Sequence, residues 1–311
     1  MANLAAKRPL ILEIKGNSLD DGPGIRSVVF FKGCPLACVW CHNPESRNPA
    51  AELAFDPPKC VDCGECRKIC PDRALSRNHP EYVARSKCRL CFLCTDVCPS
   101  GALERVGRTM TAAEVLAEVL PDQPFFDVSG GGITLSGGEP TLYMDFASEL
   151  LRMARRHGLH ALLETCGCFD LPRFMDLLYP HLDAIYYDLK IMESAAHKAF
   201  CGLPNERIID NFKALLTAAR RDGKLLLPRT PLVPGITDGE ANLRAVAAFL
   251  SGLGVNQAAL LAYNPLWHEK SRKLGIDDPL KGDPAMSAFG DGARLERGRA
   301  IYREMGIDPT G

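Results

Sequence analysis

The chain has 311 residues, of which 46% are hydrophobic and 24% charged, and its 37 basic and 38 acidic residues leave a net charge of −1. This composition is ordinary for a globular protein with a sizeable core. It gives no sign of a basic nucleic-acid surface, and no apolar run approaches the roughly 18 residues of a membrane span. Residues 1–16 lack a long apolar stretch after their basic residues, so we expect no signal peptide and a cytoplasmic location.

Strand-like and helix-like runs alternate along most of the chain. Helices are expected between the strands, including 240–253 and 111–120, which opens with a Thr111–Glu114 capping box. Each return between parallel strands needs a crossover helix, so six β/α units predict a parallel sheet. Because a closed barrel has eight strands, we expect an α/β fold, a partial (β/α)6 barrel of the TIM type. The six expected strands are 25–31, 133–136, 161–164, 184–188, 225–229 and 258–262.

The cysteines are unevenly distributed. There are 14, and 11 of them lie between Cys34 and Cys98. In a reducing compartment such clustering indicates metal binding rather than disulfides. Residues 51–105 hold eight cysteines and few periodic segments, and they follow the first strand. We therefore expect an inserted domain at 51–105, with 1–50 and 106–311 forming the barrel.

Within the insert, the pattern C-x2-C-x2-C-x3-C-P occurs twice. It is typical of bacterial ferredoxins, in which the fourth cysteine of each run binds the other cluster. Zinc sites can also use C-x2-C spacing, but two identical runs with matching prolines favour two [4Fe–4S] clusters in a ferredoxin-like α+β domain. The expected ligand sets are Cys60, Cys63, Cys66 and Cys98 for one cluster, and Cys88, Cys91, Cys94 and Cys70 for the other.

A different triplet, Cys34-x3-Cys38-x2-Cys41, precedes the insert and offers three thiolates with no fourth close by in the sequence. A cubane held by three cysteines leaves one iron open, and an open position makes a metal centre catalytic. Taken alone, the triplet is also compatible with zinc binding or coincidence.

The triplet has Trp40 before its last cysteine and follows the first strand. In both respects it resembles the cysteine motif of radical S-adenosylmethionine (SAM) enzymes. The run SGGEP at 136–140 is similar to the GGEP motif of that family, although alone it would read as a plain glycine turn. A narrower resemblance, to the activating enzymes of glycyl radical enzymes, covers essentially the whole chain. It rests on DGPGIR at 21–26, HNP at 42–44, DLK at 188–190, and Arg229 followed by Pro234-Gly235, and the insert matches the subset with two auxiliary clusters.

The resemblance implies a reaction. SAM would chelate the open iron of the Cys34–Cys38–Cys41 cluster through its amino and carboxylate groups. One electron would cleave the sulfonium and give a 5′-deoxyadenosyl radical, which would remove a hydrogen from a backbone glycine in the C-terminal glycine loop of a partner enzyme. The two auxiliary clusters would pass electrons from a ferredoxin or flavodoxin.

The resemblance also implies residue roles. Lys190 would act in catalysis with the cysteine triplet, and Asp21 would shape the groove for the partner's glycine loop. Glu164 stands where the family often has an aspartate before threonine, near the SAM carboxylate and a monovalent cation, and Asn264 stands where some relatives have histidine. The expected SAM contacts are Trp40, His42, Asn43, Gly137, Gly138, Glu139, Glu164, Thr165, Asp188, Arg229 and Asn264.

Three other cysteines, Cys166, Cys168 and Cys201, lack a cluster-binding run and are expected to be buried apolar thiols. A role facing the site stays open for Cys166 and Cys168, because they follow the strand that ends near Glu164. Isolated histidines are expected at the surface or at helix caps.

The sequence is also compatible with three other functions. The first is a radical SAM enzyme that modifies another peptide, RNA or metabolite. The second is an electron-transfer protein that consumes no SAM, and the third is a zinc- or iron-binding interaction module. The DGPGIR run argues against the first. Expected partners are choline trimethylamine-lyase, isethionate sulfite-lyase or a diol dehydratase, and no motif chooses among them.

Overall fold

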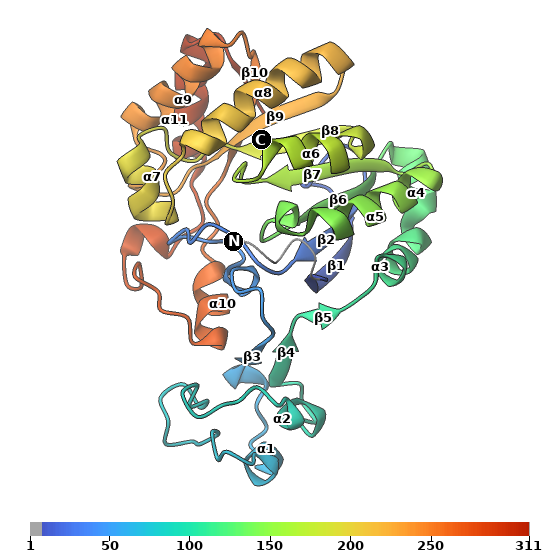
Figure 1. The fold of residues 1–311 in the computed structure, drawn as a ribbon. Helices are drawn as coiled ribbons and strands as arrows, with labels where there is room; N and C mark the ends of the chain where they lie inside the picture. Colours follow the sequence, from blue (N-terminus) through green and yellow to red (C-terminus); the bar gives the residue numbers. More distant parts are fainter. Residues whose placement is uncertain (1–7, 311) are drawn as a thin grey trace.

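The computed structural model describes residues 8–310 (Figure 1). Within that range nine strands form one sheet in the order β11-β10-β9-β8-β7-β6-β2-β1-β5. Consecutive pairs from β2 to β10 are parallel, and β11 (Asp308–Thr310) continues this pattern beyond β10. The six parallel core strands are β2 (Arg26–Phe31), β6 (Gly132–Gly137), β7 (His160–Thr165), β8 (Ala184–Asp188), β9 (Leu225–Pro231) and β10 (Gln257–Leu261).

All six predicted strands are therefore present, and the expected α/β fold with a mostly parallel sheet is confirmed. The antiparallel edge, β1 (Leu10–Ser18) and β5 (Arg108–Thr109), was not among the predicted strands, because the pairing of these distant segments is decided by tertiary packing. Residues 1–7 lie outside the described residues.

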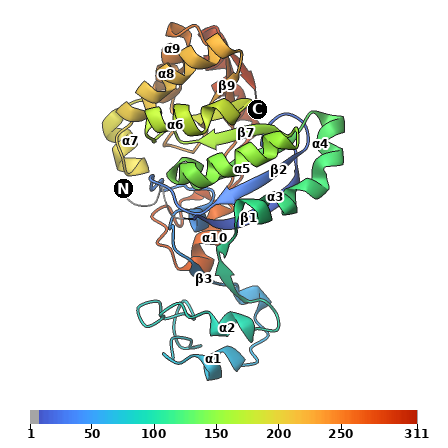
Figure 2. The same ribbon diagram turned by 45° about the vertical axis from the view of Figure 1, so that its right-hand side comes forward.

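Helices cover the outer face of the sheet (Figures 1 and 2). The predicted capping box is present: Thr111 Oγ1 accepts from Glu114 N at 3.2 Å, and the Glu114 carboxylate accepts from Thr111 N at 2.7 Å. The helices are α3 (Ala112–Val119), α4 (Gln123–Ser129), α5 (Met144–Arg156), α6 (Leu171–Leu177), α7 (Ser194–Cys201), α8 (Glu206–Asp222), α9 (Glu240–Gly252), α10 (Trp267–Leu274) and α11 (Gly292–Glu304).

The two faces of the sheet differ in chemistry. Alternate strand residues such as Val29, Leu135 and Leu163 are fully buried in a core with the helices. The residues between them point to the opposite, inner face, because side chains alternate along a strand. These are largely polar: Arg26, Thr134, Ser136, Glu164, Asp188 and Arg229.

A second, two-stranded antiparallel sheet joins β3 (Glu52–Phe55) to β4 (Leu103–Val106). The segment between them carries α1 (Glu65–Ile69) and α2 (Leu93–Asp96), has its own small core, and projects from the barrel (Figures 1 and 2). Helix α10 contacts its base: Lys273 Nζ lies 3.0 Å from an Asp56 oxygen, and Arg85 donates to the Lys273 carbonyl at 3.2 Å.

Short 3-10 helices complete the chain at Pro44–Ser46 (η1), Pro57–Lys59 (η2), Leu120–Asp122 (η3), Pro140–Tyr143 (η4), Tyr179–His181 (η5) and Pro284–Met286 (η6). Among residues 8–310, no helix has both the length and the apolar character needed to cross a membrane.

Candidate active site

The cysteine triplet lies on the loop that leaves the carboxyl end of β2. Backbone hydrogen bonds fix this loop at several points. Gly33 N donates to Ser46 O at 2.6 Å on one side, while Ala37 N donates to Cys201 O at 2.8 Å and Val39 N to Phe200 O at 3.0 Å on the other. The end of α7 therefore holds the loop against the barrel.

The triplet's thiols lie in a poorly solvated place. Cys38 is buried, as is the adjacent Trp40, and Cys34 and Cys41 are half-buried. Burial, followed by the neighbouring Cys38 and Cys34, raises the pKa of Cys41 to about 12. Because three neighbouring thiolates with little access to water repel one another, the ionised triplet needs a cationic partner, which fits the chemistry of an iron cluster.

The fold brings two further thiols to the triplet, which the sequence spacing did not show. Cys201 is fully buried and interacts with the Cys38 thiol, and this interaction lowers the pKa of Cys38 although burial opposes it. Cys166 interacts with Cys34 in the same way, and that contact and then burial raise the pKa of Cys166. Both thiols are buried, as expected. A role facing the site stayed open for Cys166, whereas Cys201 was expected only as a buried apolar thiol. Cys201 in particular carries no sequence signal for this position.

The glycine turn at 137–138 packs directly on the cysteine loop. Gly138 N donates to Phe31 O at 2.8 Å, and Glu139 N donates to Gly33 O at 2.8 Å. A side chain at Gly138 would overlap the Gly33 carbonyl, and Gly137 has φ of +103°. Two glycines are therefore required for this close approach of backbones.

Glu139 points into the protein and is fully buried. Its carboxylate accepts from Thr141 N at 3.1 Å, Thr141 Oγ1 at 2.7 Å, Thr165 Oγ1 at 3.0 Å and Cys166 N at 2.7 Å. The Glu139 and Thr165 side chains thus join the turn after β6 to the end of β7. In this arrangement they position the site, and the Glu139 carboxylate has no free face for a ligand.

A buried ionic network lies on the inner face at the carboxyl ends of β7, β8 and β9. Arg229 donates from Nε to Asp188 Oδ1 at 3.0 Å and from Nη1 to Glu164 Oε1. Lys190 Nζ donates to Asp188 Oδ2 at 2.7 Å. Burial opposes the charge on Asp188, but Arg229 and Lys190 hold its pKa below the ordinary value. Burial likewise opposes the charge on Lys190, and Asp188 raises its pKa above the ordinary value.

The DGPGIR segment lies toward the other end of the barrel. Thr134 Oγ1 donates to the Asp21 carbonyl at 2.8 Å, and the Asp21 carboxylate accepts from Ser18 Oγ. Arg26, fully buried, donates from Nε to Thr134 Oγ1 at 2.6 Å and from Nη2 to the Ile133 carbonyl at 2.6 Å. The structure therefore places Asp21 inside the amino half of the barrel, while the cysteine loop lies at the carboxyl ends of the strands.

The segment after the triplet is held by α10. Lys270 Nζ donates to the His42 carbonyl at 3.2 Å and to Asn43 Oδ1 at 2.9 Å. The His42 ring meets the backbone of Asn264, and burial followed by Lys270 lowers the pKa of His42. The consecutive residues His42 and Asn43 are thus brought together with the distant Asn264 at one side of the cysteine loop.

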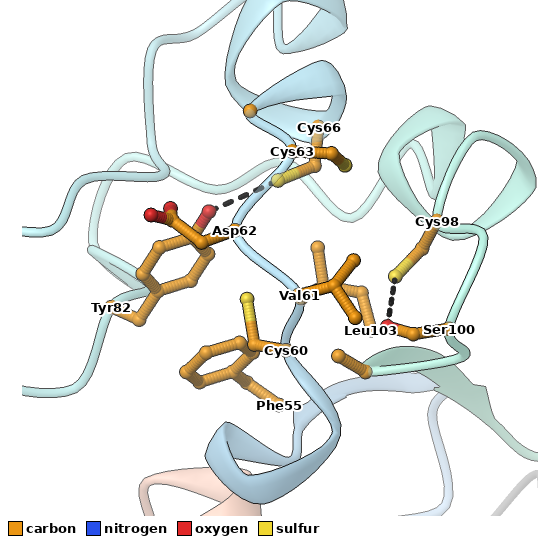
Figure 3. Close-up of a pocket in the computed structure, with 12 residues that line it drawn as sticks. Phe55, Cys60, Val61, Asp62, Cys63, Cys66, Tyr82, Cys98, Ser100 and Leu103 are labelled. Atoms are coloured by element: carbon orange, nitrogen blue, oxygen red, sulfur yellow. Dashed lines mark hydrogen bonds between the residues drawn. The ribbon is translucent and has the colours of Figure 1, made fainter.

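In the insert, one cavity is lined by Cys60, Cys63, Cys66 and Cys98, whose side chains are drawn in Figure 3. Tyr82 Oη and Cys66 Sγ are 3.0 Å apart, and the Tyr82 ring stacks on Phe55 with centroids 4.2 Å apart. Cys98, the last cysteine of the second run, thus reaches the first three cysteines of the first run.

The remaining four cysteines of the insert lie near one another. Burial, and then the neighbouring Cys88, raises the pKa of Cys94 to about 12, and Cys70 and Cys91 add to this effect. The fourth cysteine of the first run, Cys70, therefore joins the second run. Each group therefore contains four cysteine side chains, although among residues 8–310 no three Cys, His, Asp or Glu side chains are arranged to hold a single metal ion.

The chain is similar to several known proteins. The model of the radical SAM superfamily matches residues 28–245. The isethionate sulfite-lyase activating enzyme of Desulfovibrio desulfuricans is 39% identical over 91% of this chain and 92% of its own. The benzylsuccinate synthase activating enzyme of Thauera aromatica is 37% identical over 98% and 86%. The choline trimethylamine-lyase activating enzyme of Oleidesulfovibrio alaskensis is 35% identical over 96% of each chain.

Among solved structures, a radical SAM methyltransferase from Sphaerobacter thermophilus superposes with a TM-score of 0.55 at 16% identity. The match covers 96% of this chain and 76% of that one. At this identity the likeness concerns the fold.

Proposed function

The chain belongs to the radical SAM superfamily and, within it, to the activating enzymes of glycyl radical enzymes, and from this premise we propose that its Cys34–Cys38–Cys41 loop holds the [4Fe–4S] cluster that binds SAM. When bound, that cluster supplies the electron that cleaves SAM to a 5′-deoxyadenosyl radical, which removes a hydrogen from a partner's backbone glycine. The observation that carries the assignment is the cysteine loop, with Cys38 buried and Cys34 and Cys41 half-buried, held between the 137–138 turn and the end of α7.

The residues around the loop bind and orient SAM. The 137–138 turn presents backbone beside the loop, and Trp40, His42, Asn43 and Asn264 line its other side. Asp188, Lys190 and Arg229 provide charged groups at the strand ends, where barrel enzymes place their catalytic residues. Glu139 and Thr165 act by fixing the 137–138 turn.

The partner is a glycyl radical enzyme, and its C-terminal glycine loop is the substrate. The Asp21 segment, which is held inside the barrel by Thr134, forms the inner end of the groove that receives this loop. Gly22 and Gly24 adopt positive φ there, and the absence of a side chain lets Gly24 pack against the backbone of Ser129 and Gly131, which fixes the shape of the segment. Relatives serve sulfite-lyases, a trimethylamine-lyase, dehydratases and a succinate-adding synthase at 33–40% identity. Our candidates are isethionate sulfite-lyase, choline trimethylamine-lyase and a diol dehydratase.

Residues 51–105 form a ferredoxin-like insert with two [4Fe–4S] clusters, and residues 1–50 and 106–311 form the barrel. The shared cavity of Cys60, Cys63, Cys66 and Cys98 supports the crossed ligand sets (Figure 3). Cys63 and Cys91 are exposed, which suits exchange of electrons with a ferredoxin or flavodoxin.

A first experiment counts iron and sulfide in anaerobically reconstituted protein, adds dithionite and SAM, and measures 5′-deoxyadenosine. We expect about 12 iron per chain and product formation. About 8 iron with no SAM cleavage would contradict the assignment of the triplet and favour a pure electron carrier. Adding each candidate partner and recording the glycyl radical by electron paramagnetic resonance (EPR) identifies the substrate; a radical on none of the three would reject these candidates.

The relay is tested separately with a Cys63→Ala/Cys91→Ala variant. SAM cleavage driven by dithionite should persist, whereas turnover with reduced flavodoxin should fall. Equal losses with both reductants, in a variant that keeps the EPR signal of the SAM-binding cluster, would contradict the relay.

A further inference from the structure

Two carboxylates and one guanidinium meet on three adjacent strands. Asp188 and Arg229 are paired across β8 and β9, and Glu164 pairs with the residue two positions before Asp188. We propose that the Arg229 guanidinium takes the place of a metal cation between Glu164 and Asp188, so that SAM binding needs neither Na⁺ nor K⁺. This inference rests on the proposed SAM site and concerns the monovalent cation expected from the family resemblance.

Every carboxylate oxygen of the pair already has a donor. Glu164 Oε1 accepts from Arg229, and Glu164 Oε2 accepts from Ser136 Oγ at 2.6 Å. Asp188 Oδ1 accepts from Arg229, and Asp188 Oδ2 accepts from Lys190 at 2.7 Å. Hard cations require several oxygen ligands, and a metal ion here would lie against the cationic groups of Arg229 and Lys190 that already neutralise the two carboxylates.

The neighbouring threonine is also unavailable. Thr165 Oγ1 donates to the Glu139 carboxylate and accepts from Gly167 N at 3.0 Å. It therefore faces the buried Glu139 and not the Glu164–Asp188 pair, since Glu164 and Thr165 are consecutive strand residues and point to opposite faces.

The charges are balanced without a metal. Two carboxylates face Arg229 and Lys190, and the side chains of all four residues are at most one-fifth exposed. The guanidinium also lies over the Tyr186 ring, 5.3 Å from its centre. Its planar, forked donors can span two carboxylates at once, which a lysine ammonium cannot do as well. The residues present thus do not fit an additional cation.

The test compares wild type with Arg229→Gln, and Arg229→Lys as a second variant that keeps the charge. SAM dissociation constants are measured on reconstituted protein in NaCl, KCl and tetramethylammonium chloride of equal ionic strength. Thermal unfolding of the same proteins without SAM gives a second readout in the same three salts. For wild type we expect the SAM dissociation constants in the three salts to agree within about twofold, and the unfolding midpoints to agree within about 1 °C.

Removing the guanidinium should create the metal dependence. Arg229→Gln should bind SAM about tenfold more tightly in Na⁺ or K⁺ than in tetramethylammonium, and its midpoint should rise in the metal salts. A wild-type protein with tenfold tighter SAM binding in Na⁺ or K⁺ would overturn the proposal. So would a folded Arg229→Gln protein insensitive to both ions. Arg229→Lys keeps a cation at the position and should depend less on the metal ions than Arg229→Gln. If Arg229→Gln does not fold, the wild-type comparison decides: equal SAM binding in the three salts supports the proposal, and tenfold tighter binding in Na⁺ or K⁺ overturns it. If the wild-type protein bound SAM in none of the three salts, the result would instead contradict the proposed function. The unfolding midpoints of wild type and Arg229→Gln in the three salts would then show whether Arg229 replaces a metal ion.

Discussion

The barrel and the insert hold their cysteines by different means. In the barrel, the cysteine loop is fixed by protein: backbone hydrogen bonds from Ala37 and Val39 to the end of α7, and from Glu139 to Gly33. In the insert, eight cysteines lie on a segment whose helices have five and four residues and whose sheet has two strands. The small core of the insert has nine buried residues. Two of them, Cys66 and Cys94, belong to the cysteine runs, and a third, Tyr82, contacts Cys66 through its hydroxyl.

This difference indicates which interactions stabilise the fold of each region. The barrel has a large core between its sheet and helices, and it can position its loop without metal. The insert is too small to be stabilised by apolar burial alone, so the two clusters that we propose for it should contribute to its folding as structural metals do in small domains.

The largest effect is expected from removing a thiol that binds the cluster, compared with removing a thiol that only lies beside it. Cys38→Ala should abolish SAM cleavage and lower the iron content by about four per chain, because it removes one of the three thiols that we propose as ligands of the SAM-binding cluster. Cys201→Ala is the matched control, since its thiol touches Cys38 from α7 and is not part of the triplet. It should keep the iron and most SAM cleavage. Iron loss in the Cys201 variant comparable to that of Cys38→Ala would make Cys201 a ligand.

Removing iron should unfold the insert before the barrel. In chelator-treated protein, amide hydrogen exchange within residues 57–102 should accelerate by about a hundredfold or more, because metal binding energy is folding energy for such a segment. Amides of β6 to β8 should stay protected, since their core contains no cluster ligand. Hydrogen-exchange mass spectrometry measures both regions together, and equal protection of insert and barrel would show that the insert folds without its clusters.

A smaller loss is expected from Glu139→Ala. The variant leaves the hydroxyls and amides of Thr141, Thr165 and Cys166 without their buried acceptor, at a cost of about 3 kcal/mol in the free energy of unfolding. Glu139→Gln keeps one acceptor oxygen and should lose less. Anaerobic denaturant unfolding gives both values. A barrel as stable as wild type in Glu139→Ala would show that the 137–138 turn is held by its backbone contacts alone.

The smallest effect concerns the junction between the two regions. Lys273 pairs with Asp56 at 3.0 Å and with Glu269 at 3.0 Å, and such partly exposed pairs contribute about 0.5 kcal/mol each. Lys273→Ala should leave global stability nearly unchanged, slow turnover with reduced flavodoxin a few-fold, and spare the dithionite-driven reaction. The control is Lys68→Ala, whose exposed pair with Glu65 lies entirely within the insert. If both variants behave alike with flavodoxin, α10 does not set the position of the insert.

Much of the fold could be predicted because its signals are local. Six apolar strand segments separated by helical segments identified the parallel sheet, and the capping residues Thr111 and Glu114 located the start of α3. The antiparallel edge was missed because the partner of β1 is decided by tertiary packing. Among site residues, the cysteine spacing located the triplet, but no local pattern showed that Glu139 is turned inward.

The sequence by itself determined the chemistry that depends on contiguous spacing: three thiols on one loop, two repeated four-cysteine runs, and a glycine pair after a strand. Only the tertiary structure decided which distant side chains meet. Arg229 reaches Asp188 across 41 residues and Glu164 across 65, and Cys201 reaches Cys38 from the end of another helix. Periodicity assigns a residue to a face of its strand, whereas strand order and register, set by packing of the whole sheet, decide which residue lies opposite.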